Sequence, residues 1–183
     1  MKRLSLIATL ILAVLLLQNC KKDTITETAT SSNTLFAVIN DTTWSATKIN
    51  ASLTYNAAAK TKVFTCTGFA TNQEVAFTIT ATNQTDNSAS FPVQSFSDDG
   101  VATTFAYLTS TGSGNYVQQG QVTPQSGTII FTAVDAVKKV CSGTFYFTTT
   151  QNNYDGHGNI VSITKNEVFD GAFNNMPYTF TSN

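Results

Sequence analysis

The sequence predicts an all-β domain, a single antiparallel β-sandwich of roughly ten short strands, with a partly open β-barrel as the alternative. Apolar and polar residues alternate through most of the chain after residue 34, and this period of two is that of a strand. No segment of that region holds a helical period. The composition agrees, because 13 Phe and 6 Tyr occur with abundant Thr, and all three residue types favour strands.

Length and charge narrow the classes of function. With 183 residues, the chain suits one domain with a sizeable core. Only 11% of the residues are charged, and the formal net charge is −1. Removal of residues 1–19 would take Lys2 and Arg3 away and change the net charge to −3. Such a chain is not expected to bind nucleic acid, and no cofactor is expected.

The N-terminal residues predict a lipoprotein signal peptide, a signal helix over residues 1–19. Lys2 and Arg3 precede an almost unbroken apolar run over residues 4–17, shorter than the about 20 residues that span a membrane. Cys20 follows, and its placement resembles the lipobox of bacterial lipoproteins, in which the cysteine is lipidated and begins the mature chain. Asn19 departs from the small residue usual there. The alternative is an ordinary signal peptide that contains a cysteine.

Residues 20–34 predict a lipidated cysteine followed by a flexible tether, because they are polar and rich in Thr and Ser. Several acyl chains on one residue would attach the protein stably to a membrane. By the same resemblance, Lys21 rather than Asp after the cysteine implies the outer membrane. Whether the domain faces the periplasm or the cell surface stays open. The predicted β-sandwich domain occupies residues 35–183.

Strands are predicted wherever the alternation holds, with Gly, Asn, Asp and Ser marking the turns between them. The predicted strands cover residues 35–39, 42–49, 51–55, 63–69, 74–81, 91–96, 104–108, 116–122, 126–134, 140–150, 160–164 and 168–173. Residues 151–159 are predicted as a loop, and the residues after Pro177 as a frayed end. Asn40 and Asp41 both tolerate left-handed backbone, which predicts a tight first hairpin.

Residues 126–150 are the most strongly patterned stretch and predict a β-hairpin. Ile129, Phe131 and Ala133 share one face of its first arm, and Cys141, Gly143, Phe145 and Phe147 share one face of its second. Charged residues gather at positions 135–139 between the arms, as expected for a solvated turn. Gly127 and Gly143 are interpreted as places where a neighbouring aromatic ring or backbone comes close.

Cys66 and Cys141 lie inside predicted strands, where two alternatives stay open. They can be two small buried apolar residues, or they can form the kind of disulfide that an exported protein keeps. The sequence does not decide between them, because a bridge needs Cα atoms within about 7 Å. A nucleophilic thiol is not predicted, since neither cysteine has a base nearby in sequence.

Candidate metal ligands are few, and each has a competing interpretation. Asp98 and Asp99 are adjacent carboxylates beside Gly100, and they are interpreted first as part of a solvated loop. Asp155 lies close to His157, the single histidine, in a segment rich in Gly and Asn that is interpreted first as a turn. No metal is therefore predicted, and Asp98, Asp99 and Asp155 remain the candidates if one binds.

Aromatic side chains are the candidates for ligand contact. Tyr107, Tyr116 and Tyr154 lie in or near predicted loops, although packing in the core or at its rim is the competing interpretation for each. Trp44, the single Trp, is interpreted as a core residue rather than a platform for a ligand.

Several short motifs occur in a fixed order. They are residues 36–40 (FAVIN) with Trp44 and Ala46, residues 126–129 (SGTI), residues 142–147 (SGTFYF), and residues 161–164 (VSIT) with Val168 and Phe169. Together they resemble a family of small Bacteroidota lipoproteins of unknown function, marked by an ING-x-x-W start and an SGTF-x-F hairpin near the end. Asp41 stands where that family has Gly, and Asn166 and Glu167 replace its usual turn Gly. The resemblance implies no catalytic residue and no ligand.

These observations predict a non-catalytic envelope lipoprotein that displays a β-sandwich domain for binding a partner protein or a glycan. Its other partner would be the membrane, reached through the lipid anchor. An enzyme is not predicted, because positioned acids, bases and metal ligands are scarce. The alternative is a hydrolase that acts on envelope or extracellular polymer, and it would need Asp98, Asp99 and Asp155 to converge in one cleft.

Overall fold

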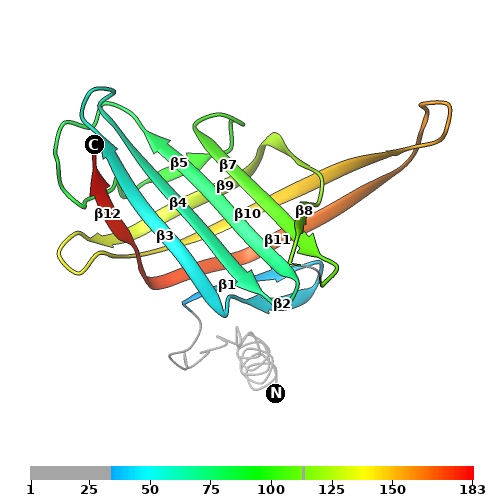
Figure 1. The fold of residues 1–183 in the computed structure, drawn as a ribbon, viewed down its shortest axis with the longest axis horizontal. Coiled ribbons are helices and arrows are strands. Elements are labelled where there is room, and N and C mark those ends of the chain that lie inside the picture. The colour runs from blue at the N-terminus through cyan, green and yellow to red at the C-terminus, as the bar shows by residue number, and fades with distance from the viewer. Residues whose placement is uncertain (1–33, 113) are drawn as a thin grey trace, which may run out of the picture. The chain divides into compact units, whose positions relative to one another are not determined.

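A computed structural model describes residues 34–112 and 114–183. They form two six-stranded β-sheets packed face to face, which confirms the predicted sandwich over the partly open barrel (Figure 1). Among these residues none is helical, and no helix is long and apolar enough to cross a membrane. The predicted signal helix, the lipidated Cys20 and the tether up to residue 33 lie outside the described residues.

Twelve strands make up the two sheets, close to the number predicted. In spatial order, the first sheet contains β2 (Thr42–Ser45), β1 (Leu35–Ile39), β11 (Ile160–Pro177), β10 (Val140–Tyr154), β9 (Gln121–Asp135) and β6 (Ser95–Ser97). The second contains β12 (Thr179–Ser182), β3 (Lys48–Asn56), β4 (Thr61–Ala70), β5 (Gln73–Ala81), β7 (Thr103–Ser110) and β8 (Tyr116–Gln118).

Three strands of the first sheet are longer than predicted. β9 and β10 each have 15 residues, and β11 has 18. The predicted strands 160–164 and 168–173 are therefore one strand, and β10 continues into the segment predicted as a loop. Thr, Asn and Gln occupy both faces there, so no alternation reveals the strand, yet pairing between β10 and β11 continues to Tyr154 and Ile160.

Other predicted strands divide or shrink. Residues 42–49 separate into β2 and β3 of opposite sheets, and residues 116–122 separate into β8 and β9. Residues 91–96 contribute only the start of the short β6. The prediction of a frayed end after Pro177 is wrong, because β12 pairs with β3. That pairing is parallel, so the sandwich is not wholly antiparallel.

Phenylalanine rings fill the space between the sheets. The ring centroid of Phe131 lies 5.0 Å from that of Phe91, 5.1 Å from that of Phe64 and 5.2 Å from that of Phe173. Offset and edge-to-face contacts of this kind stabilise a core beyond the area that they bury. Both sheets contribute to this cluster, since Phe64 belongs to β4 and Phe131 to β9.

The hairpin of β9 and β10 forms as predicted, with a turn between Asp135 and Val140, but it contains an irregularity. Ile129 and Phe131 face the core, whereas Ala133 is exposed. The register between β9 and β10 shifts in this region, so Val134 rather than Ala133 stands opposite the buried Cys141. Such a bulge moves the later residues of a strand to the other face.

Two glycines let β10 and β11 come together under aromatic rings. Gly143 pairs with Phe173, and Gly171 pairs with Phe145. A Cβ atom at Gly143 would lie 2.1 Å from the Ile130 carbonyl oxygen and 2.3 Å from the Phe173 ring. The close approach predicted for Gly143 is confirmed.

The first hairpin also forms as predicted. Asn40 and Asp41 have φ values of 46° and 63°, the left-handed backbone that a two-residue hairpin turn requires. The hairpin places Trp44 in the core, where a Cβ on Gly68 would lie 2.9 Å from its ring. Trp44 is therefore a core residue, as interpreted from the sequence.

A buried lysine fastens the long segment between β5 and β6. The Lys62 side chain is 0% exposed, and its Nζ lies 3.1 Å from both carboxylate oxygens of Asp86. Nζ also donates to the carbonyl oxygen of Ser90 at 2.8 Å. Because its charge is fully paired, this ammonium holds the segment in place.

Candidate functional site

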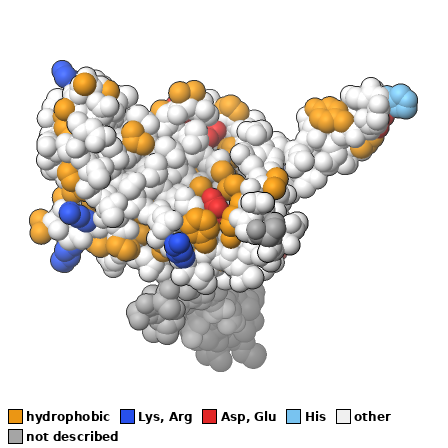
Figure 2. Space-filling model, in the orientation of Figure 1, with side chains coloured by type: hydrophobic (Ala, Val, Ile, Leu, Met, Phe, Trp, Pro, Cys, Tyr) orange, Lys and Arg blue, Asp and Glu red, His pale blue; other side chains and the backbone are white. Residues whose placement is uncertain are grey.

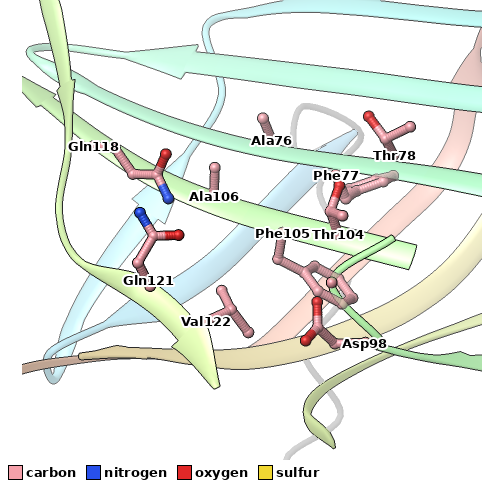
Figure 3. Close-up of a pocket in the computed structure, with 11 residues that line it drawn as sticks. Ala76, Phe77, Thr78, Asp98, Thr104, Phe105, Ala106, Gln118, Gln121 and Val122 are labelled. Atoms are coloured by element: carbon pink, nitrogen blue, oxygen red, sulfur yellow. The ribbon is translucent and has the colours of Figure 1, made fainter. Parts of the chain in front are cut away.

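A pocket of about 280 Å³ lies beside the outer edge of β7. β8 pairs with β7 only at Leu108–Ser110, so within residues 34–112 and 114–183 the rest of that edge has no neighbouring strand in the sheet. The polar part of the lining comes from Thr78, Asp98, Thr104, Gln118 and Gln121, with Phe105 and Val122 among the apolar residues (Figure 3).

The crossing of the chain between the two sheets makes one wall of the pocket. Gln118 ends β8 in the second sheet, and Gln121 begins β9 in the first. Gly120 between them has a φ of 81°, and a Cβ there would lie 2.5 Å from the Thr150 carbonyl oxygen, so only glycine fits. The crossing places the side-chain amides of Gln118 and Gln121 close together over the pocket (Figure 3).

Asp98 lies on the opposite side of the pocket and is 2% exposed. Its backbone is fixed, because its N–H donates to the Gly127 carbonyl oxygen at 2.9 Å and its carbonyl accepts from the Gln125 N–H at 3.0 Å. The carboxylate stands near the ring of Phe105 (Figure 3), and its Oδ2 atom has no hydrogen-bond partner among the described residues. Burial and the charge of Asp99 raise the pKa of Asp98, while the N–H of Gly100 partly opposes them.

Asp99 has the opposite surroundings. Its Oδ1 accepts hydrogen bonds from the backbone N–H groups of Val101, Ala102 and Thr103 at 2.9, 2.7 and 2.9 Å. These bonds lower the pKa of Asp99, with that from Thr103 the largest cause. The solvated-loop interpretation is confirmed for Asp99, which shapes the loop. It is wrong for Asp98, because the loop folds that side chain under the edge of β7.

A second hollow, of about 470 Å³, shares Gln118 and Gln121 with the pocket. Gln151, Asn152 and Tyr154 of β10 also line it. The two glutamines therefore stand between a pocket that contains a buried carboxylate and a more open hollow that contains amides and an aromatic ring.

Beyond these hollows, β10 and β11 extend from the sandwich as a two-stranded ribbon, residues 151–165, which we call the arm (Figures 1 and 2). The pairing of β9 with β10 ends at Thr150, and the pairing of β1 with β11 ends at Val168. Within the arm, Asn153 Nδ2 donates to the hydroxyl oxygens of Ser162 and Thr164, both at 3.0 Å.

The tip of the arm carries Asp155 and His157. Asp155 Oδ1 accepts from the backbone N–H groups of His157 at 2.8 Å and Asn159 at 2.9 Å. Bonds from Asn159 are the largest cause that lowers the pKa of Asp155. The turn interpretation is confirmed, and the exposed histidine stands at the far end of the arm (Figure 2).

The three aspartates proposed for a hydrolase do not converge. Asp155 belongs to the tip of the arm, whereas Asp98 and Asp99 belong to the loop between β6 and β7 in the body of the sandwich (Figure 1). In the part of the chain that the structure describes, no group of three or more His, Cys, Asp or Glu side chains could hold a metal ion.

The three candidate tyrosines have different surroundings. Tyr107 is buried, and its hydroxyl accepts from Gln73 Nε2 at 3.0 Å. Tyr116 packs edge-on against Phe69, with ring centroids 5.9 Å apart. Tyr154 is exposed and lines the second hollow, so it alone of the three is placed to contact a ligand.

Cys66 and Cys141 are buried free thiols from opposite sheets. Met176 lies by both, with its Sδ 3.6 Å from Cys66 Sγ and its carbonyl oxygen 3.7 Å from Cys141 Sγ. Burial raises the pKa of Cys141 to about 12 and that of Cys66 further. Neither thiol is therefore a nucleophile at neutral pH.

Comparison with known proteins gives no relative. No family model, no curated protein and no solved structure matches the chain. Sequence reasoning missed Gln118, Gln121 and Thr104 as pocket residues. A single sequence carried no signal for them, because the two chain segments meet only in the folded sandwich.

Proposed function

We propose that the protein is a non-catalytic lipoprotein of the outer membrane that displays its β-sandwich to bind a partner protein through the arm. The observation that supports this proposal is a two-stranded ribbon that leaves the sandwich with apolar side chains exposed. Ile160, Val161 and Ile163 are all more than half exposed. An isolated ribbon of two strands is marginally stable in water, so a partner that covers it would stabilise it.

The edges of the arm suggest the form of the partner. The backbone of Glu167 is bonded to Asn40, but the stretch of β11 before it has no described strand on its outer side. An extended segment of another protein can add to such an edge, with backbone hydrogen bonds that supply affinity. Val161 and Ile163 alternate with Ser162 and so share one face of the ribbon, where they would pack against the added segment.

The predicted anchor fits this function. Lipidation of Cys20 would hold the protein at the membrane, and residues 21–33, if extended at about 3.3 Å per residue, could place the domain tens of Å from it. The resemblance to Bacteroidota lipoproteins supports the same location. In this proposal the envelope partner meets the arm rather than the face of either sheet.

Site-specific photo-crosslinking in cells tests the proposal. A photoreactive residue at Ile163 should give a discrete adduct with one envelope protein. The same residue at Val137, which is 93% exposed in the β9–β10 turn, should give none. A Val161→Ser substitution in the Ile163 reporter should reduce the adduct. Equal adducts at both positions, or no adduct at Ile163, would contradict docking on the arm.

A further inference from the structure

We propose that the pocket beside β7 and the adjoining second hollow form a carbohydrate-binding site, in which Asp98 accepts hydrogen bonds from sugar hydroxyl groups. This site adjoins the apolar face of the arm proposed above, because Asn152 of the second hollow pairs with Ile163 and the side chains of such a pair share a face. It would give the protein a small-molecule or glycan ligand in addition to its protein partner.

The unpaired carboxylate oxygen of Asp98 favours a ligand that donates hydrogen bonds. A buried polar atom without a partner is destabilising, and native structures rarely keep one without a reason. Asp98 Oδ2 is such an atom. The backbone N–H and carbonyl of Asp98 are both hydrogen-bonded, so the position of this residue is fixed. A ligand that donates hydrogen bonds from inside the pocket would satisfy this atom.

The side chains that line the pocket match the chemistry of a sugar. Apart from Asp98, the polar side chains that line the pocket are uncharged, including Thr78, Thr104 and Gln121. Phe105 and Val122 supply apolar surface next to them. A sugar presents hydroxyl groups and C–H surface together, and it therefore matches a mixture of amides, hydroxyls, one carboxylate and apolar groups. A bare metal ion would need several oxygen ligands, and a single carboxylate with neutral groups does not favour one.

The uncovered backbone of β7 adds further polar groups. The carbonyls of Thr103 and Tyr107 point to this edge, since they accept from the N–H groups of Asp99 and Gln119 at 3.2 and 2.8 Å. Successive residues of a strand alternate in direction, so the N–H and C=O of Phe105 point to the same edge. They lie where β8 no longer pairs, and they offer a donor and an acceptor that a sugar can use.

The pocket and the second hollow adjoin each other and share two lining residues. The pocket of 280 Å³ is near the lower end of ligand cavities, about 300 to 1,000 Å³, and suits one sugar unit. Gln118 and Gln121 also line the hollow of 470 Å³, where Asn152 and the exposed Tyr154 are available for a second unit. We therefore expect a disaccharide or the end of a longer glycan, with its terminal unit on Asp98 and the next against Tyr154.

Saturation-transfer difference NMR on the full-length chain tests this site. The protein is kept in a zwitterionic detergent, because detergents with a sugar headgroup would compete. The probes are maltose, cellobiose and N,N′-diacetylchitobiose with their monosaccharides, all at millimolar concentration. At least one disaccharide should bind. Asp98→Asn should weaken binding about tenfold or more, since it removes charge-assisted hydrogen bonds. Asp170→Asn, which changes an exposed acid outside both hollows, should leave the affinity unchanged.

A pair of tyrosine variants tests whether the second hollow itself contacts the ligand, or whether loss of any exposed ring weakens binding. Tyr154→Ser should weaken binding of the disaccharide but should leave binding of its monosaccharide unchanged. Tyr146→Ser, which removes a similarly exposed ring from the outer face of the first sheet, should alter neither. Three results would overturn the proposal. They are that no sugar probe binds, that sugar binding is unaffected by Asp98→Asn, or that the diamine putrescine binds in a way that depends on Asp98 while the sugars do not. The Asp98→Asn measurement is independent of the crosslink on the arm, because Asp98 belongs to the loop between β6 and β7 in the body of the sandwich.

Discussion

Asp98 and Asp99 are neighbours in sequence, yet the fold places their carboxylates in opposite surroundings. Three backbone N–H groups surround Asp99 and lower its pKa, while burial raises the pKa of Asp98. Asp99 stabilises the loop whose backbone N–H groups it accepts from. Asp98, when it is ionised, destabilises the folded state, as expected for a residue that serves binding rather than stability.

A stability measurement can detect this difference. Asp98→Asn should raise the free energy of unfolding by about 1 kcal/mol at neutral pH, because it removes a buried charge and keeps an acceptor for the Gly100 N–H. Because the pKa of Asp98 is raised in the folded state, Asp98 is protonated in the folded chain at a higher pH than in the unfolded chain. The advantage of the variant should therefore shrink below neutral pH and disappear once Asp98 is protonated in both states.

Urea unfolding at neutral pH and at about pH 4 measures both effects. Asp170→Asn is again the control, and its stability relative to the unmodified chain should change little between the two pH values. A variant at Asp98 that is no more stable than the unmodified chain at neutral pH would contradict the account of this carboxylate as an unpaired buried charge.

The burial of Asp98 could not be predicted from the sequence. Two adjacent acids before a glycine are typical of a solvated loop, and that pattern describes Asp99 well. Asp98 is buried because Gln125 and Gly127 of a distant strand bond its backbone. Such a contact joins chain segments with no local signal. Tyr154 was within reach of sequence reasoning, since an aromatic residue before a turn of Asp, Gly and Asn is expected near a loop.

At the scale of elements, alternation predicted strands wherever one face is apolar. The hairpin of β9 and β10 and the inward face of β5 both follow it, with Val75, Phe77 and Ile79 all buried. Alternation failed where both faces are polar, as in the end of β10 after Thr150, and where a bulge reverses the faces, as at Ala133. In those places the pairing partner, and not the composition, determines the strand.

The packing of β10 on β11 makes a sharp prediction for Gly143. Gly143→Ala should lower the free energy of unfolding by about 1–3 kcal/mol, since the added methyl would meet the Ile130 carbonyl and the Phe173 ring. Gly156→Ala at the tip of the arm is the matched control, because a Cβ there meets nothing within 4 Å. Thermal unfolding of both variants checks the prediction, and equal melting temperatures would show that β10 and β11 can separate without loss.

At the scale of the whole molecule, the proposed anchor decides where the sandwich works. Cys20→Ser should abolish acylation and release the protein from the membrane fraction, because the proposed acyl chains on Cys20 would be its attachment to the membrane. Membrane fractionation with labelling by a clickable fatty acid measures both effects. Cys66→Ser should leave acylation intact, since that thiol is buried in the core. Retention of the Cys20 variant in membranes would contradict the anchor.

The pairing of β1 with β11 has a consequence for how the chain folds. β3, β4, β5 and β7 follow one another as neighbours in the second sheet, so this meander can form from local contacts as the chain emerges (Figure 1). β1 is the first strand of the domain, but its sheet can close only when Leu35 pairs with Phe173, near the end of the chain. Such long-range pairing is slow to form. The apolar face of the first sheet would therefore stay open until β11 has been made and has paired with β1.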